Sequence, residues 1–178
     1  EEMQARGRRC KSIVSGILMS AGETRGESSG ETTVHEFFDE LIAEWNATRK
    51  SRELHFENRF GEDLDIASDS VLKQTVCNLL DNALEASPMW VGLEVSRDQD
   101  DMLIRVFDRG PGFAGEVFER LGQPYQSTKG RPGSGLGLFL VFNVVRTLGG
   151  EVQTNNLPGE GAEVILRLPL EALLLKED

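Results

Sequence analysis

The sequence predicts an α/β two-layer sandwich, in which one mixed sheet is covered by one layer of helices. Three features of the 178 residues support this fold class. Helical and strand-like segments follow one another in the order helix, strands, helix, strands, helix, strands. Apolar residues recur at helical spacing in some segments and at alternate positions in others. The chain contains no internal repeat, which excludes a solenoid or a propeller.

Residues 1–22 are predicted to form a helix of their own. Ile13, Ile17 and Leu18 follow a roughly helical period, which ends at Gly22. The Gly-, Ser- and charge-rich stretch 23–31 is typical of a linker. We therefore expect a compact domain at 32–178. Because the first residues read as the middle of a helix, we expect the chain to be part of a longer protein.

The first half of the compact domain is predicted to hold two helices and a strand. Residues 33–37 form a short strand or a helix entry. Apolar residues then lie on one side of a helix over 36–47, and they alternate in a strand over 53–60. The strongest helix is 69–87, where Ser68, Asp69 and Ser70 offer N-cap oxygens and Pro88 follows the end.

The second half is predicted to hold four strands and one buried helix. Two strands are separated by the turn-forming sequence DQDD, and a long polar loop runs to residue 134. The helix that follows is apolar nearly all round and ends at two glycines. The predicted ranges are strands at 90–96, 102–108, 151–155 and 162–168, and a helix at 136–148.

Composition and charge restrict the function. Hydrophobic residues make up 39% and charged residues 28%, the ordinary balance of a globular domain. The net charge of −11 disfavours binding to nucleic acid, so a site for a phosphorylated ligand must be local. Cys10 and Cys77 form no CxxC, which favours a reducing compartment. The sequence shows no signal peptide and no apolar run of about 20 residues, so we expect a cytoplasmic location without membrane contact.

The polar face of the helix 69–87 is the first candidate site. Asn78 and Asn82 lie one turn apart, within an arc of about 100° opposite the apolar stripe. An asparagine oxygen is a hard ligand that suits Mg²⁺. A plain solvated helix face explains the same pattern. The residues of the arc are Gln74, Asn78, Asp81, Asn82 and Glu85.

Two glycine-rich segments are the second and third candidates. Asp108 directly follows a strand, and its carboxylate could accept a hydrogen bond from an exocyclic amine, while Gly110 and Gly112 would let the backbone approach a planar ring. A tight turn with a capping Asp is the alternative. Glycines that open the helix 136–148 leave N–H groups free to bind phosphate. No GK[ST] follows, and Leu138 stands where a dinucleotide fingerprint needs glycine, so a flexible hinge is the alternative.

Taken together, NLLDNALEA, DRGPGF and GSGLGL resemble the N, G1 and G2 boxes of the GHKL superfamily, in its histidine-kinase branch. FERLGQPYQSTKG resembles the F box and ATP lid of that branch, and the resemblance covers residues 32–170. It implies a Bergerat-type ATP-binding fold and the cofactors ATP and Mg²⁺. It also implies a protein histidine kinase that transfers the γ-phosphoryl group of ATP to a histidine.

The resemblance assigns roles residue by residue. Asn82 matches the asparagine that coordinates Mg²⁺, and Asn78 matches a position near the phosphates. ATPase members carry a water-activating Glu at the position of Asn78, so hydrolysis should be poor here. Asp108 matches the adenine-reading aspartate, and Lys129 could neutralise phosphate charge, while Glu85 departs from a common phosphate-contacting Lys. The remaining nucleotide-binding positions are Gly110, Gly112, Gly133, Ser134, Gly135, Leu136 and Gly137.

The histidine that would accept the phosphoryl group is missing. His35 lacks the Pro of the usual acceptor motif, and its neighbours Phe37 and Phe38 read as core residues. We therefore expect the acceptor in an upstream dimerisation domain, whose second helix ends at residues 1–22. The implied partners are that domain, a response regulator and a second kinase subunit in a full-length homodimer. The location becomes the cytoplasmic portion of a membrane-anchored kinase.

Residues 6–18 resemble the corresponding region of the RegB/PrrB type of redox-responsive kinase. Cys10 lies among Arg8, Arg9 and Lys11, and such cations favour the thiolate. Cys10 is therefore a candidate redox-regulatory residue, with an incidental exposed thiol as the alternative. Cys77 is expected to be buried and inert. Two other functions stay open: a GHKL ATPase or anti-sigma-type serine kinase, and a non-catalytic nucleotide-sensing module.

Overall fold

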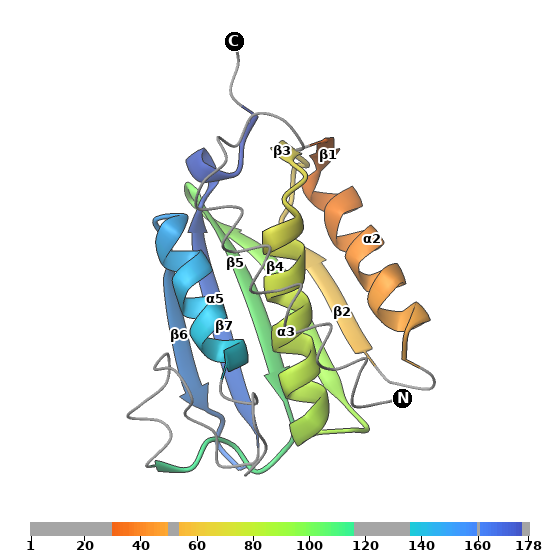
Figure 1. Ribbon diagram of the computed structural model, residues 1–178, viewed down its shortest axis with the longest axis vertical. Helices are drawn as coiled ribbons and strands as arrows, with labels where there is room; N and C mark the ends of the chain where they lie inside the picture. Colours follow the sequence, from red (N-terminus) through yellow and green to blue (C-terminus); the bar gives the residue numbers. More distant parts are fainter. Residues whose placement is uncertain (1–29, 50–53, 116–135, 160, 176–178) are drawn as a thin grey trace.

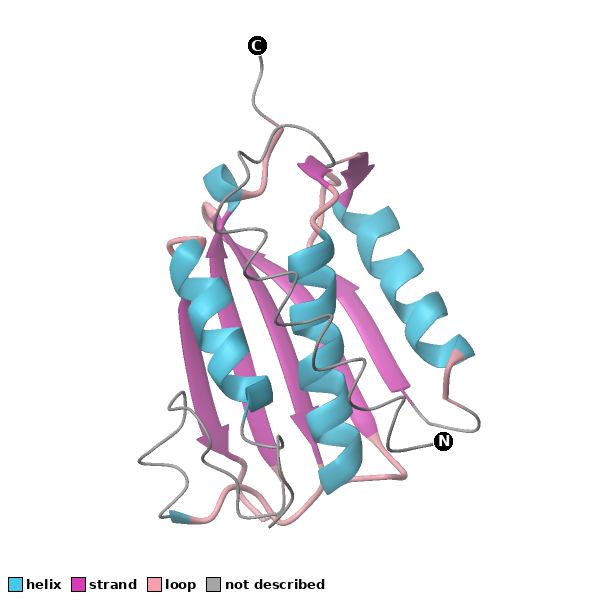
Figure 2. Ribbon diagram, viewed as in Figure 1, coloured by secondary structure: helices cyan, strands magenta, loops and turns pink. Residues whose placement is uncertain are grey.

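The structure is a computed structural model that describes residues 30–49, 54–115, 136–159 and 161–175. Within these ranges a five-stranded sheet has the order β2-β4-β5-β7-β6, and three helices lie side by side over one of its faces (Figures 1 and 2). Only the β2–β4 pair is parallel, so the sheet is mixed. The predicted two-layer α/β sandwich is confirmed. The helices are α2 (Val34–Ala47), α3 (Ser70–Ala86) and α5 (Leu136–Thr147), and the strands are β2 (Leu54–Arg59), β4 (Val91–Asp98), β5 (Asp101–Asp108), β6 (Glu151–Asn156) and β7 (Ala162–Pro169).

The core lies between the sheet and the three helices. Side chains alternate along β5, where every second residue from Met102 to Asp108 is buried, as expected for a strand with one covered face. Leu93 and Leu166 on the neighbouring strands are fully buried beside them. The helices contribute their apolar stripes to the same cluster, which includes Phe37, Phe38, Leu41, Trp45, Leu72, Val76, Leu80, Val141 and Val145.

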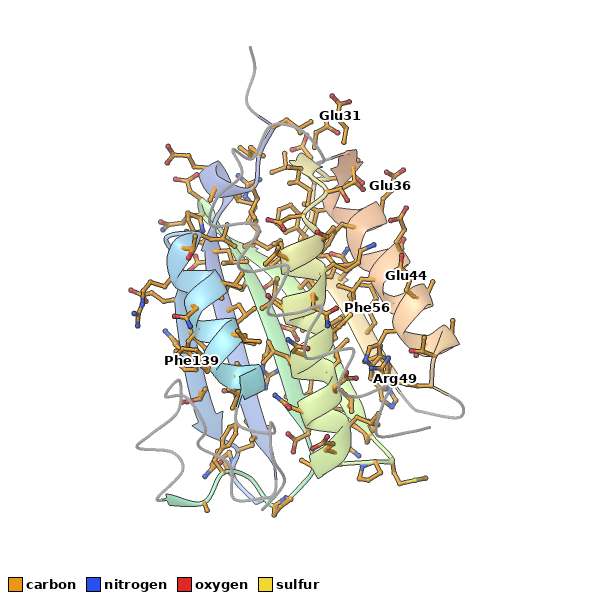
Figure 3. The ribbon with its side chains drawn as sticks, viewed as in Figure 1. Glu31, Glu36, Glu44, Arg49, Phe56 and Phe139 are labelled. Carbon is orange, nitrogen blue, oxygen red and sulfur yellow. The ribbon has the colours of Figure 1, made fainter. Side chains whose placement is uncertain are left out.

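Helix α2 begins two residues before the predicted start at residue 36. The Thr33 hydroxyl accepts a hydrogen bond from the Glu36 N–H, which satisfies one of the free donors of the first turn. Phe37 and Phe38 are buried, as expected. The acidic side chains Glu36 and Glu44 project from the helix away from the sheet (Figure 3). The cap, which sequence pattern did not predict, therefore fixes where the helix starts.

Three short elements were not predicted. β1 (Glu31–Thr33) and β3 (Asp65–Ala67) form a separate two-stranded antiparallel sheet, and Ile66 of β3 also bridges to Leu174. A 3₁₀ helix, η1 (Leu170–Ala172), follows β7. Each element has three residues, which is too short for a periodic pattern to show. β1 is the first described element and starts at residue 31, one residue before the expected domain start.

Helix α5 is less buried than its apolar composition suggests. Val141, Val144 and Val145 are buried against the sheet and α3, whereas Gly137, Leu138, Phe139 and Leu140 are half-buried. Arg146 and Thr147 are exposed in the last turn. The helix is therefore a covering element with one partly open flank rather than a fully buried core helix.

The other face of the sheet carries charged and aromatic side chains. Arg105 of β5 bonds to Glu163 of β7 at 2.5 Å, and Arg167 of β7 contacts both Asp98 and Asp101 at 2.7 Å. The pairs of Arg105 with Glu163 and of Arg167 with Asp101 join the neighbouring strands β5 and β7, where side chains on one face meet, and the contact with Asp98 reaches β4 beyond β5. The helices thus leave this face polar and cover only its opposite.

Candidate functional site

The asparagines lie on α3 as predicted. Asp69 accepts hydrogen bonds from the N–H groups of Val71 and Leu72 and so starts the helix. The side of α3 that faces the sheet is apolar. Asn78 and Asn82 are half-buried and lie outside this apolar stripe. Gln74 donates to the Asn78 oxygen over 3.2 Å, so these two amides form one polar ridge along the helix.

Asp81, which the sequence placed in the same polar arc, faces α2 instead. Its carboxylate accepts a hydrogen bond of 3.0 Å from the Trp45 indole N–H and another from the Arg49 guanidinium. The Arg49 guanidinium also lies 4.7 Å from the centre of the Trp45 ring, and its side chain extends from the end of α2 toward α3 (Figure 3). Asp81 therefore ties α2 to α3 and is not directed at a ligand.

The start of α5 lies beside Asn82. A Cβ atom built on Gly137 would sit 3.5 Å from the amide nitrogen and 3.7 Å from the amide oxygen of Asn82. Because Gly137 is the second residue of α5, the first described turn of this helix lies near the Asn82 side chain. The N-terminus of a helix favours anions such as phosphate. The structure therefore places Gly137 of the GSGLGL segment next to Asn82 of the predicted helix face.

Asp108 ends β5 next to the C-terminal end of α3. The residue is buried, with 7% of its surface exposed, and its carboxylate accepts a hydrogen bond of 2.8 Å from the Gly110 N–H. A Cβ atom on Gly110 would lie only 2.5 Å from the Ala86 carbonyl oxygen. The chain after Asp108 thus passes directly beneath the last turn of α3.

Gly112 and Gly161 allow close packing around the loop that follows Asp108. Gly112 has a φ of +78°, and a Cβ atom there would lie 2.9 Å from the Asn156 side-chain oxygen. Gly161 contacts the other side of the loop, where its Cβ would meet the Asp108 carbonyl oxygen at 2.0 Å. Glycine at 110 and 112 therefore allows close packing within the protein, and the approach of a planar ring to this backbone stays a prediction.

These pieces lie at one end of the sandwich. The C-terminal ends of α3, β5 and β6 and the N-terminal end of α5 all point to the lower end of the view in Figure 1. Asn82, Gly137 and the loop after Asp108 come from segments about 25 to 55 residues apart, as their numbering shows. Glu85 is exposed on the last turns of the same α3.

Several predicted residues lie outside the described residues. These are Cys10, Lys129, Gly133, Ser134 and Gly135. Leu136 is described only as the first residue of α5. Sequence reasoning missed the contacts of Asn156, Trp45 and Arg49, which bind the Asp108 loop and Asp81. Their positions in a helix and a turn are visible in the sequence, but only the pairing of distant segments reveals these contacts.

Cys77 has the environment of an unreactive thiol. Burial raises the pKa of the Cys77 thiol to about 11, and the negative charge of Asp81 acts in the same direction. The thiol is therefore protonated at neutral pH, and the thiolate is the reactive form. This agrees with the expected inertness, although Cys77 is half-buried rather than fully buried as predicted.

The described donors fit a magnesium ion held mainly by phosphate. Within the described ranges, no three His, Cys, Asp or Glu side chains gather where they could hold a metal ion. The amide oxygen of Asn82 beside α5 is a hard donor. Mg²⁺ commonly takes one or two protein ligands and completes its shell with water and phosphate oxygens. A magnesium ion here would therefore depend mainly on phosphate oxygens and water, with Asn82 as a protein donor.

The fold and the arrangement of these segments define an ATP-binding domain of the GHKL type. The chain belongs to the family described as histidine kinase-, DNA gyrase B-, and HSP90-like ATPases, whose sequence model matches residues 67–172. Within this family it is a catalytic ATP-binding domain of the histidine-kinase kind, as its relatives indicate.

Two curated relatives and one solved structure illustrate the similarity. Sporulation kinase B of Bacillus subtilis is 34% identical over 113 residues, which are 61% of this chain and 26% of the relative. Histidine protein kinase DivJ of Caulobacter vibrioides is 36% identical over 115 residues, 61% of this chain and 19% of the relative. The mycobacterial sensor histidine kinase MprB superposes with a TM-score of 0.66 at 25% identity, over 80% of this chain and 97% of that structure. The chain spans about a quarter or less of the length of the two curated relatives.

No helix among the described residues combines the length and the apolar character needed to cross a bilayer.

Proposed function

We propose that the chain binds Mg-ATP and transfers the γ-phosphoryl group to a histidine of a dimerisation domain of the same kinase. The observation that carries the proposal is the position of Gly137 against Asn82, which places the first turn of α5 beside the amide ridge of α3. The family match and the sensor kinases among the relatives support it. As a transferase, the domain would act by holding and orienting ATP.

In this proposal, different residues contact the adenine, the phosphates and the magnesium ion. Asp108 would accept a hydrogen bond from the exocyclic amine of adenine, because its carboxylate is buried and held by the Gly110 N–H. The first turn of α5 would donate N–H groups to phosphate oxygens. Asn82 would supply one oxygen to Mg²⁺, which when bound neutralises charge on the phosphates. Lys129 and the glycines 133 and 135 would complete the phosphate contacts.

Asn78 favours transfer to a protein over hydrolysis. An amide cannot remove a proton from water, so this position offers no general base. In the proposed reaction the bond between the γ-phosphorus and the β–γ bridging oxygen breaks, and a bond to an imidazole nitrogen forms. ADP leaves with the electron pair of the broken bond. Asn78 would contribute by keeping the ridge polar near the phosphates.

The proposed partners follow from the same reaction. They are the phosphoacceptor histidine domain, a response regulator that receives the phosphoryl group, and a second kinase subunit in the full-length homodimer. The domain would work in the cytoplasmic portion of a membrane-anchored kinase.

Redox regulation through Cys10 is a separate hypothesis, based on its cationic neighbours Arg8, Arg9 and Lys11. Oxidation would form an intermolecular disulfide or a sulfenic acid and lower kinase activity. Non-reducing gels of oxidised protein, with Cys10→Ser as the control, test it. If both proteins stay monomeric and mass spectrometry finds no oxidised Cys10, the hypothesis is wrong.

One experiment tests the proposed function directly. The chain is mixed with a separately produced phosphoacceptor domain and γ-labelled ATP, and acid-labile phosphohistidine is measured. We expect transfer by the wild type and its loss in Asn82→Ala. Asn46→Ala, the same change on the exposed side of α2, is the matched control and should transfer normally.

Other outcomes of this experiment would contradict parts of the proposal. Release of inorganic phosphate without phosphohistidine would indicate an ATPase. Binding of an ATP analogue, together with neither phosphohistidine nor inorganic phosphate formed from ATP, would indicate a nucleotide-sensing module. The acceptor domain must be one that a known kinase can label. Unchanged Mg-ATP affinity in Asn82→Ala would show that the metal assignment is wrong.

A further inference from the structure

The side chain of Asn156 makes a two-point contact with the backbone that follows the Asp108 loop. Its carboxamide oxygen accepts a hydrogen bond of 2.7 Å from the Phe113 N–H. Its carboxamide nitrogen donates one of 2.9 Å to the Phe113 carbonyl oxygen. The backbone N–H and C=O of Phe113 are thus both hydrogen-bonded to one side chain, 43 residues away in the sequence. This arrangement imitates the pairing of neighbouring strands, with a side chain in place of a strand.

The position of Asn156 gives this contact a rigid base. Asn156 is the last residue of β6 and pairs with Ala162 at the start of β7. The turn between these strands also contacts the loop, because Gly161 lies against the carbonyl of Asp108. The end of the sheet therefore supports the loop at both ends, at Asp108 and at Phe113.

The two glycines of the loop pack closely against the elements on either side of it. Gly112 has a positive φ, and a Cβ atom there would meet the Asn156 oxygen at 2.9 Å and the Gly161 carbonyl oxygen at 3.2 Å. On the opposite side, Gly110 lies against the Ala86 carbonyl. The loop is therefore enclosed between the last turn of α3 and the β6–β7 turn. Asp108 and Gly110, which are bonded to each other, lie inside this enclosure.

We propose that Asn156 is a positioning residue for nucleotide binding, which holds the 108–113 loop in the conformation that presents Asp108 to the base. The inference rests on the proposed function, since it concerns the same site. We call the two-point contact of Asn156 with Phe113 the clamp. Without the clamp the loop samples other conformations, and the apparent affinity for nucleotide falls in proportion to the population of the binding conformation. Asn156 itself touches no ligand.

The alternative is a purely structural role, in which the contact stabilises the domain without affecting the site. Asn155→Ala is a matched control for this alternative. Asn155 precedes Asn156 on the same strand, is also exposed, and bonds to Glu163 on the neighbouring strand rather than to the loop. Its loss removes a hydrogen bond of the same chemical kind from the same strand.

The test measures the affinity of a non-hydrolysable ATP analogue by calorimetry, at a temperature well below the Tm of every variant. We expect Asn156→Ala to weaken binding about fivefold to thirtyfold, the effect of losing about two hydrogen bonds that order the loop. Asn155→Ala should bind as the wild type does. Asn156→Asp should bind no better than Asn156→Ala, because a carboxylate can accept from the Phe113 N–H but repels its carbonyl oxygen.

The outcomes separate this inference from the function on which it rests. If the wild type does not bind the analogue, the proposed function fails. If the wild type binds and Asn156→Ala binds equally well, or if Asn155→Ala loses as much affinity, the clamp is only structural. Hydrogen exchange of the Phe113 amide gives a second readout, and slow exchange persisting in folded Asn156→Ala would also overturn the inference.

Discussion

Replacing Gly110 by alanine should damage the domain at one defined contact. The added Cβ atom would lie 2.5 Å from the oxygen, 2.9 Å from the carbonyl carbon and 3.0 Å from the Cβ atom of Ala86. Two of these three atoms belong to the backbone of the last turn of α3, which cannot move away like a long side chain. The loop itself must therefore shift, and Asp108 must shift with it.

The cost follows from the size of this overlap. Inserting a methyl group into a tightly packed place costs about 1–3 kcal/mol. At a middle value of about 2 kcal/mol, a chain of this length loses about 4–8 °C of Tm. We also expect weaker ATP binding, since displacement of Asp108 misaligns its carboxylate. Calorimetric unfolding gives the Tm, and titration with an ATP analogue gives the affinity.

Gly115→Ala is the matched control for this prediction. A Cβ atom at Gly115 meets nothing within 4 Å, and its backbone lies outside the left-handed region. The control removes the same glycine freedom from the unfolded chain without creating the overlap. If Gly110→Ala unfolds at the temperature of Gly115→Ala and binds the analogue equally well, the close packing against α3 has been misjudged.

Two further predictions address the charge of Asp108 and the burial of Cys77. Asp108→Asn keeps an acceptor for the Gly110 N–H but loses the charge, so ATP affinity measured by calorimetry should fall about tenfold to a hundredfold. Asp98→Asn, a half-exposed carboxylate of β4, should bind normally, and equal affinities of the two variants would contradict the assigned role. Since folding raises the pKa of Cys77 from 9.0 to about 11, its contribution to stability is present below pH 9 and is lost as pH rises toward about 11. Denaturant titrations should show the unfolding free energy falling more steeply over this range in the wild type than in Cys77→Ala, and parallel curves would count against the raised pKa.

Local signals in the sequence were enough to predict the main elements. The helix with Asn78 and Asn82 was predicted at 69–87 and is found at Ser70–Ala86, because Asp69 is a strong N-cap and Pro88 follows the end. β4 and β5 were expected at 90–96 and 102–108 and each proved slightly longer, up to the turn between them. Periodicity and turn residues determine such elements, and both are visible in a single sequence.

Contacts between distant segments could not be predicted in the same way. Helical periodicity put Asp81 in the polar arc, but it cannot show that Trp45 and Arg49 of another helix bind its carboxylate. The sequence singled out the glycines after Asp108 as ligand-binding positions, but it could not show that a side chain there would meet Ala86 and Asn156. Asn156 opens the turn sequence NLPGEG, which predicts a turn between two strands but not a contact with Phe113.

The order of strands makes the site depend on the last part of the chain. β7 is the last strand in sequence, yet it lies between β5 and β6 in the sheet (Figure 1). Until β7 is synthesised, β5 has an open edge at the strand that carries Asp108, and β6, which carries Asn156, has no partner strand. Open edges favour aggregation. A nascent or truncated chain without β7 therefore lacks the support of the Asp108 loop, and under the proposed function ATP would not act as a folding ligand before β7 is in place.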